Sequence, residues 1–239
     1  MSEKTDAEKE NIHQGHRERL KQRCVREGLN SFTDHQALEL LLFYAMPYKD
    51  TNELAHRLLQ HFGAFSDVLD ADYIELLRVP GVGKNTATLL SSFPEFFRRY
   101  KLDKFGEKPI LSSVALAGEY CANLFLTSTY EAFYLICLDS HLRVQRAALI
   151  NEGALSLVSV PPRLVVEAAL RHRAACVLFS HNHPSGVLRP SAQDLELTQY
   201  LASALDTIDI KLLDHIIVAR GQYFSMAQKG LVNAKYYTE

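Results

Sequence analysis

Three residues that could bind one metal ion, His181, His183 and Asp194, lie within 14 consecutive positions. Two histidines separated by one residue, where a strand runs into a loop, can converge on one ion, and the spacing places Asp194 in the first turn of the next helix. Catalytic Zn²⁺ commonly takes three such nitrogen and oxygen ligands and leaves the fourth position to water, whose pKa falls to about 7. The pattern therefore predicts an open zinc site that hydrolyses its substrate.

A His-x-His pair is more often a surface feature than a metal site, but the segments on either side of this pair favour a metal site. Residues 174–180 form a continuous apolar run that predicts a buried strand, and the Pro-Ser-Gly run at 184–186 predicts a turn after it. Ser191 is a natural N-cap for a predicted helix over 191–205. In a purely structural interpretation Ser191 and Asp194 only cap this helix, but that interpretation leaves the histidines unexplained.

The spacing also resembles a known signature. His181-x-His183, seven residues, Ser191, two residues and Asp194 match the complete His-x-His-x7-Ser-x2-Asp pattern of the JAMM (MPN-plus) metalloproteases. Longer segments are similar to those of the RadC branch of bacterial proteins, and the resemblance covers nearly the whole chain. These segments are 181–186, 190–191 and 213–218.

The resemblance implies one zinc ion per chain, hydrolysis of a peptide or isopeptide bond, and a Glu from an earlier strand that acts on the water. It also implies that the Ser191 hydroxyl helps to hold the oxyanion beside the metal. The chain departs from the family at one place: RadC-like chains usually have Pro-Arg-Glu where this one has Pro162, Arg163 and Leu164, so a carboxylate is absent there.

The general base must come from an element packed beside the histidine strand, because it has to reach the water. Glu131 opens a predicted strand over 131–138, and the resemblance points to the same residue. Glu152, in a turn, and Glu167, inside a predicted helix, are rivals, and on the residues alone the three are equal candidates. Asp214 and His215 lie on another predicted strand. They could orient a ligand, but a His before an apolar run is more often a satisfied core residue, so we leave both out of the site.

Residues 77–90 resemble a helix-hairpin-helix. Gly81 and Gly83 would allow the tight turn, while backbone N–H groups at the next helix start could bind a phosphate, with Lys84 adding charge. Residues 1–104 carry 15 Lys and Arg against 16 Asp and Glu, a net charge of −1, which lacks the footprint of a strongly basic nucleic-acid binder. DNA binding and a hairpin kept for core packing or a protein contact both stay open.

A chain of 239 residues, of which 47% are hydrophobic, can form one large or two modest domains, and a change of pattern near residues 101–112 predicts a boundary between two. Residues 1–11 are charged and predict a disordered tail, and 12–100 predict a helical helix-hairpin-helix module. Residues 101–112 predict a linker. Residues 113–239 alternate in the order α-β-β-α-β-α-β-β, which predicts a JAMM/MPN domain with a central mixed sheet flanked by helices, so the fold class is α/β (α+β).

These observations lead to a zinc-dependent hydrolase acting on a protein or peptide substrate, in a DNA-associated context if the hairpin binds DNA. A zinc-dependent nuclease is the first alternative, since zinc-activated water can in principle attack a phosphodiester. A DNA-bound scaffold with a structural metal is the second. No apolar stretch approaches the ~20 residues of a membrane span, and we expect a cytoplasmic protein without a membrane partner.

Overall fold

The computed structural model describes residues 3–47, 49–156 and 159–232. The chain divides into two compact units, Met1–Phe96 and Phe97–Glu239. Within the described part of the chain, no helix combines the length and apolarity needed to cross a bilayer.

The described residues of the N-terminal unit form helices and no strands, and leucines at helical spacing, among them Leu38, Leu58 and Leu76, form much of its core. Its helices are α1 (Glu3–Glu27), α2 (Asp34–Ala45), α3 (Asn52–Phe62), α4 (Phe65–Asp70), α5 (Tyr73–Arg78) and the first part of α6 (Lys84–Lys104). The short α4 was not predicted.

Two helices of this unit differ from the sequence-based expectation. Helix α1 begins at Glu3, although residues 1–11 predict a disordered tail. Glu and Lys, which dominate this stretch, are good helix formers even where no apolar face exists. Helix α6 continues to Lys104, into the predicted linker at 101–112. The chain leaves the helix at Gly106, where φ is +81°, a conformation that glycine adopts without strain.

The C-terminal unit contains the elements in the predicted order, and its sheet confirms the predicted fold class. The elements are α7 (Val114–Leu124), β1 (Ala132–Leu138), β2 (Val144–Glu152), α8 (Pro162–Arg171), β3 (Cys176–Asn182), α9 (Ala192–Asp206), β4 (Lys211–Ala219) and β5 (Gln222–Ser225). The strand order is β2-β1-β3-β4-β5, with β3 and β4 parallel and the other pairs antiparallel.

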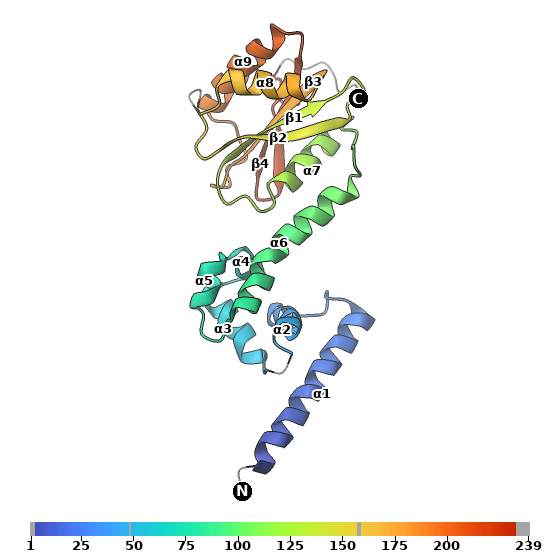
Figure 1. Cartoon of the computed structure of the whole chain (residues 1–239), viewed down its shortest axis with the longest axis vertical. Coiled ribbons are helices and arrows are strands. Elements are labelled where there is room, and N and C mark those ends of the chain that lie inside the picture. The colour runs from blue at the N-terminus through green and yellow to red at the C-terminus, as the bar shows by residue number, and fades with distance from the viewer. Residues whose placement is uncertain (1–2, 48, 157–158, 233–239) are drawn as a thin grey trace. The chain divides into compact units, whose positions relative to one another are not determined.

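Helices cover both faces of this sheet (Figure 1). Alternate residues of β1 point to opposite faces: Phe133 and Leu135 pack with α8 and α9, whereas Ile136 and Leu138 pack with α7. Burial on both faces explains why β1 and β3 are nearly continuous apolar runs. Each fully buried large side chain contributes roughly 1.5–3 kcal/mol to stability.

The strand register brings the chemistry-bearing residues to one end of the sheet. In the antiparallel β1–β3 pair, Phe133 lies opposite His181, so the start of β1 lies beside the end of β3. The parallel strands β3 and β4 are joined through α9, and the loop after β3 leads directly into this helix. The end of β3, the start of β1 and the N-terminus of α9 therefore surround one point.

Candidate metal centre

The three predicted metal ligands converge. His181 is fully buried in β3, His183 is the first residue beyond this strand, and Asp194 is the third residue of α9. The Nε2 atoms of the histidines are 2.9 Å apart, and carboxylate oxygens of Asp194 lie 3.3 Å from Nε2 of His181 and 3.5 Å from Nε2 of His183. Metal–ligand distances of about 2.0–2.1 Å in a tetrahedral zinc site place neighbouring ligand atoms about 3.3 Å apart. The donor set therefore fits zinc.

His183 is oriented through its backbone and its ring. Its N–H donates to the Val218 carbonyl of β4 at 2.8 Å, and its Nδ1 lies 2.7 Å from the Val187 carbonyl. Because a carbonyl only accepts, Nδ1 carries a proton, and Nε2 is the ring nitrogen turned toward the other two ligands. The hydrogen bond to Asp194 raises the pKa of His183 above its usual value, while burial acts in the opposite direction.

His181 contacts a residue that sequence reasoning left out. Its Nδ1 lies 2.7 Å from Nε2 of His215 on β4, and both side chains are fully buried. Burial lowers the pKa of His215 well below its usual value, so its ring is neutral. The sequence signal is the polar pair Asp214-His215 inside an apolar strand, but the pair alone does not identify the partner.

Ser191 caps α9, as the sequence predicts. Its backbone N–H and its hydroxyl donate to Oδ2 of Asp194 at 2.6 and 2.7 Å, and the hydroxyl oxygen accepts from the Asp194 N–H at 3.1 Å. Burial alone raises the pKa of Asp194, but the contacts with the His181 and His183 rings outweigh it and hold that pKa below its usual range. Asp194 is therefore a carboxylate, and the single hydroxyl proton of Ser191 is engaged with it.

Glu131 reaches the same point from the start of β1. A carboxylate oxygen of Glu131 and ring nitrogens of His181 and His183 all lie within 4.8 Å of one another. Its Oε2 also accepts from the Leu155 N–H at 3.3 Å. The rivals are not part of this group. Glu152, at the end of the edge strand β2, pairs with Ala132 but does not line the hollow beside the ligands, and the Glu167 carboxylate accepts a hydrogen bond from Arg163 on the exposed side of α8.

Asn182, between the two histidines, was not predicted as a site residue. Its Oδ1 accepts from the Ala132 N–H at 2.8 Å, and its Nδ2 donates to the Tyr130 carbonyl at 2.9 Å. The Asn182 side chain therefore forms hydrogen bonds with the backbone on both sides of Glu131. Local sequence shows the polar residue, but its partners follow from the β1–β3 register.

A hollow of about 390 Å³ opens beside these residues. One wall carries carboxylates and a histidine of the site. The rest mixes apolar residues with polar ones, and Arg189 is the cationic side chain in the lining. The lining consists of Glu131, Ala154, Leu155, His183, Ser185, Val187, Arg189, Pro190, Ser191, Gln193 and Asp194. The candidate ligands are thus accessible to a substrate.

Comparison with known proteins agrees with this geometry. Residues 111–231 match the family model described as RadC-like JAB domain. The chain is also 36% identical over 215 residues to the UPF0758 protein of Variovorax paradoxus (strain S110), which covers 90% of this chain and 96% of the relative. The chain is a RadC-like member of the JAB/MPN family. JAB-domain proteins include metalloproteases and bind zinc.

Leu164 on α8, where the sequence resemblance leads us to expect a Glu, is 44% exposed. It is not among the residues that line the hollow.

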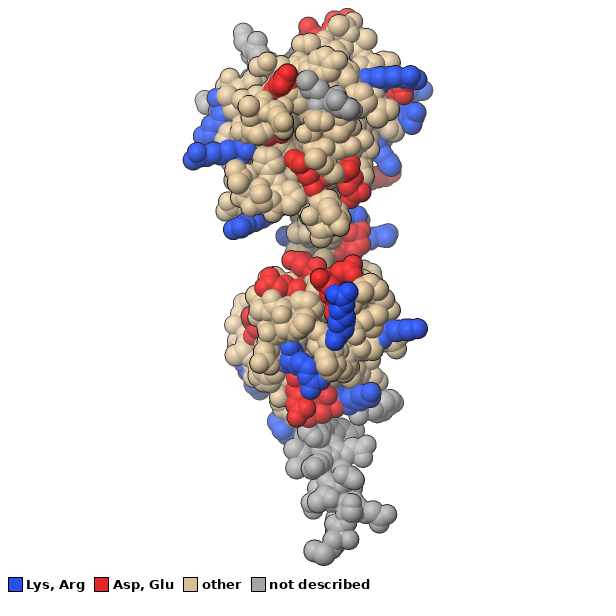
Figure 2. All heavy atoms as spheres, turned by 90° about the vertical axis from the view of Figure 1, so that its left-hand side faces the viewer, with Lys and Arg blue, Asp and Glu red and all other residues tan. Residues whose placement is uncertain are grey.

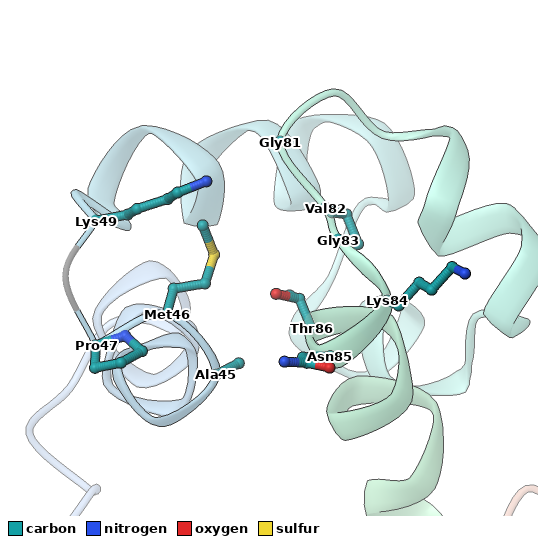
Figure 3. Close-up of a pocket in the computed structure, with 10 residues that line it drawn as sticks. All are labelled: Ala45, Met46, Pro47, Lys49, Gly81, Val82, Gly83, Lys84, Asn85 and Thr86. Atoms are coloured by element: carbon teal, nitrogen blue, oxygen red, sulfur yellow. The ribbon is translucent and has the colours of Figure 1, made fainter.

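The N-terminal unit of this RadC-like chain has a second hollow, of about 600 Å³, against the predicted hairpin. Residues 45–47 and 49 line one side, and residues 81–86 line the other. Figure 3 shows Lys49 extending toward the hairpin, whereas Lys84 points away from the hollow. Gly81 has a φ of +97°, as a tight turn requires. Gly83 does not have a positive φ, so the turn does not require a glycine at this position. A Cβ at position 83 would meet open space.

The charged side chains that line this hollow are those of Lys49 and Lys84. On the face shown in Figure 2, Lys and Arg are interspersed with Asp and Glu on each unit. The hairpin leads into α6, whose first backbone N–H groups have no partner within the helix. An anion could therefore be bound through backbone amides without a basic surface.

Proposed function

We propose that this chain is a zinc-dependent hydrolase that cleaves a peptide or isopeptide bond. The observation that carries the proposal is the convergence of Nε2 of His181, Nε2 of His183 and the Asp194 carboxylate, with the Glu131 carboxylate beside them. The family membership supports it, because JAB-domain proteins include metalloproteases.

Zinc, when bound, would act as a Lewis acid and lower the pKa of a water molecule to about 7. His181, His183 and Asp194 would hold it. The Glu131 carboxylate would accept a proton from the attacking water while the water oxygen bonds to the carbonyl carbon. Glu131 would then pass this proton to the leaving nitrogen as the C–N bond breaks. The Ser191 hydroxyl would turn its proton from Asp194 to the developing oxyanion.

Family membership favours an amide over a phosphodiester, because JAB-domain proteins include metalloproteases. The charge of the hollow does not decide between them: bound zinc would offset the carboxylates of Glu131 and Asp194, and Arg189 adds a cationic side chain. We therefore place the nuclease second, and a scaffold with a structural metal third, because structural zinc sites are usually closed by four protein ligands.

The proposal is tested with purified, zinc-loaded protein on peptide, isopeptide and single- and double-stranded DNA substrates. Glu131→Gln should lower turnover on the cleaved substrate by about 10²–10⁴-fold while zinc stays bound, whereas the matched control Glu152→Gln should keep full turnover. Replacing both His181 and His183 by Ala should remove the zinc. Failure of wild-type protein to hold zinc after reconstitution, or loss of activity in Glu152→Gln but not in Glu131→Gln, would contradict the assignment.

We further propose that the hairpin of the N-terminal unit binds a DNA backbone without reading its sequence. The hollow beside Gly81 and the amide-rich start of α6 support this role. Binding should weaken as salt rises, with the shallow slope of about 2–4 phosphate contacts.

A matched pair of full-length variants tests the hairpin. Gly83→Ala should bind labelled DNA as wild type does, because its Cβ meets open space. Gly83→Asp should abolish binding, because its carboxylate would repel the phosphate. Equal binding by both variants, or none by wild type at low salt, means that the hairpin serves packing or a protein contact.

A further inference from the structure

The buried side chains of His215 and Thr198 link His181 to the backbone of Asp194 through hydrogen bonds, in addition to the direct contact between His181 and the Asp194 carboxylate. Nδ1 of His181 lies 2.7 Å from Nε2 of His215, and Nδ1 of His215 lies 2.6 Å from Oγ1 of Thr198. The Thr198 hydroxyl in turn donates to the backbone carbonyl of Asp194, one helical turn earlier in α9. Three elements, β3, β4 and α9, are thus joined by hydrogen bonds behind the metal ligands.

The direction of every proton in this connection follows from the acceptor at its end. The Asp194 carbonyl can only accept, so the single hydroxyl proton of Thr198 is committed to it. Nδ1 of His215 must therefore donate to Oγ1 of Thr198. With its Nδ1 donating and its ring enclosed by Phe133 and Phe179, His215 accepts at Nε2, so Nδ1 of His181 donates to it. Nε2 of His181 is then the nitrogen available to a metal, and it lies 3.3 Å from Oδ1 of Asp194.

A merely space-filling role does not account for these contacts. His215 is fully buried, with its ring meeting those of Phe133 and Phe179 edge-on at centroid distances of 5.7 Å. A hydrocarbon side chain would suit such surroundings without the cost of desolvating two nitrogens. Both nitrogens instead face polar groups that lead to the two metal ligands.

We propose that Thr198 and His215 are positioning residues that fix His181 as its Nδ1–H tautomer, so that Nε2 is kept free for the metal. The proposal rests on the proposed function only in taking His181 as a metal ligand. Partners of this kind on a ligating histidine typically affect metal affinity by about 10–100-fold.

Thr198→Val gives the sharpest test, because it removes the hydroxyl and keeps the shape. Nδ1 of His215 then has no acceptor, so His215 should shift its proton to Nε2 and donate to Nδ1 of His181. His181 must then carry its own proton at Nε2, where the metal would bind. Imidazole ¹⁵N spectra of the metal-free protein should show Nδ1–H for His181 in wild type and Nε2–H in Thr198→Val. Thr198→Ser, which retains the hydroxyl, should restore the wild-type spectrum.

His215 is tested by a second pair. Gln at this position can present an oxygen acceptor where Nε2 of His215 lies, whereas Phe fills the space without an acceptor. His215→Gln should keep His181 in the Nδ1–H form, and His215→Phe should not. Zinc affinity, measured by competition with a chelator, should fall about 10–100-fold in Thr198→Val and His215→Phe. It should stay unchanged in Thr86→Val, a control at a buried threonine of the other unit.

The two readouts separate this inference from the proposed function. The spectra need no metal, so a wild-type protein that binds no zinc would end the proposed function while the tautomers still decide the positioning role. If the His181 tautomer is unchanged in Thr198→Val and His215→Phe, the inference is wrong, even if the protein binds zinc and hydrolyses its substrate. Loss of zinc affinity in Thr86→Val to the same extent would also overturn it, because the effect would then be one of general stability.

Discussion

Replacement of Asn182 by Ala should damage stability and catalysis together, because this side chain ties the start of β1 to the end of β3. Its two hydrogen bonds, to the Ala132 N–H and the Tyr130 carbonyl, hold the backbone that carries Glu131. Ala132 is buried, with 3% exposure, whereas Tyr130 is 69% exposed. Water can therefore replace the lost donor at Tyr130 but not the lost acceptor at Ala132.

The size of the effect follows from this difference. An unsatisfied buried N–H costs about 1–3 kcal/mol, and a hydrogen bond that water can replace costs up to about 1 kcal/mol. We expect a loss of about 1–4 kcal/mol in the free energy of unfolding, or a fall of roughly 4–16 °C in Tm for a unit of this size. A displacement of Glu131 by about 1 Å should lower kcat about 10²-fold.

Asn123→Ala is a matched control, since Asn123 is also buried and donates to the Glu119 carbonyl at 2.9 Å on α7. It should cost about 1 kcal/mol and leave kcat unchanged. Thermal unfolding, zinc content and turnover are measured on both variants. If Asn182→Ala keeps wild-type kcat, or loses its zinc together with its activity, then Asn182 does not act through Glu131.

Three further predictions concern the C-terminal unit. Gly118→Ala should destabilise it by about 1–3 kcal/mol in urea unfolding, because the new Cβ would lie 2.4 Å from the Tyr223 ring; Gly83→Ala, in open space, should not. Burial raises the pKa of Asp214 from 3.8 to about 6, so the folded state binds the extra proton and stability should fall by about 2 kcal/mol as pH rises from 4 to 6; an equal slope in Asp214→Asn would contradict this. Chelation should lower the Tm of wild type, since a site filled at 100 times Kd contributes about 2.7 kcal/mol, but should not lower that of the His181→Ala/His183→Ala variant.

Local patterns were sufficient for the elements that carry the candidate site. The apolar run before His181, the turn at 184–186 and the N-cap Ser191 each lie within a few residues of the structure they predict. Helix and strand order in the C-terminal unit followed from the same short-range periodicity. The predicted order therefore agrees with the structure, with small differences at the ends of the elements.

Helix ends and charged segments were less accessible to this reasoning. The sequence predicts that α6 stops at Tyr100, but the helix continues to Lys104 because Leu102 and Phe105 pack against the core of the C-terminal unit. This packing is a tertiary contact that periodicity does not show. At the other end of the chain, low hydrophobicity argued against order in 1–11, while the helix propensity of Glu and Lys argued for a helix.

The residues that sequence reasoning missed all act across the sheet. Asn182 is adjacent to both candidate histidine ligands in sequence, yet its partners at Tyr130 and Ala132 are 52 and 50 residues away. His215 is 34 residues from His181, and their contact depends on the parallel register of β3 and β4. Such a register is set by burial on both faces of the sheet and cannot be read from one strand alone. A sequence motif can therefore identify candidate metal ligands, whereas the groups that orient them become visible only in the fold. Substitution of His215 would test metal binding, and substitution of Asn182 would test the placement of the base Glu131.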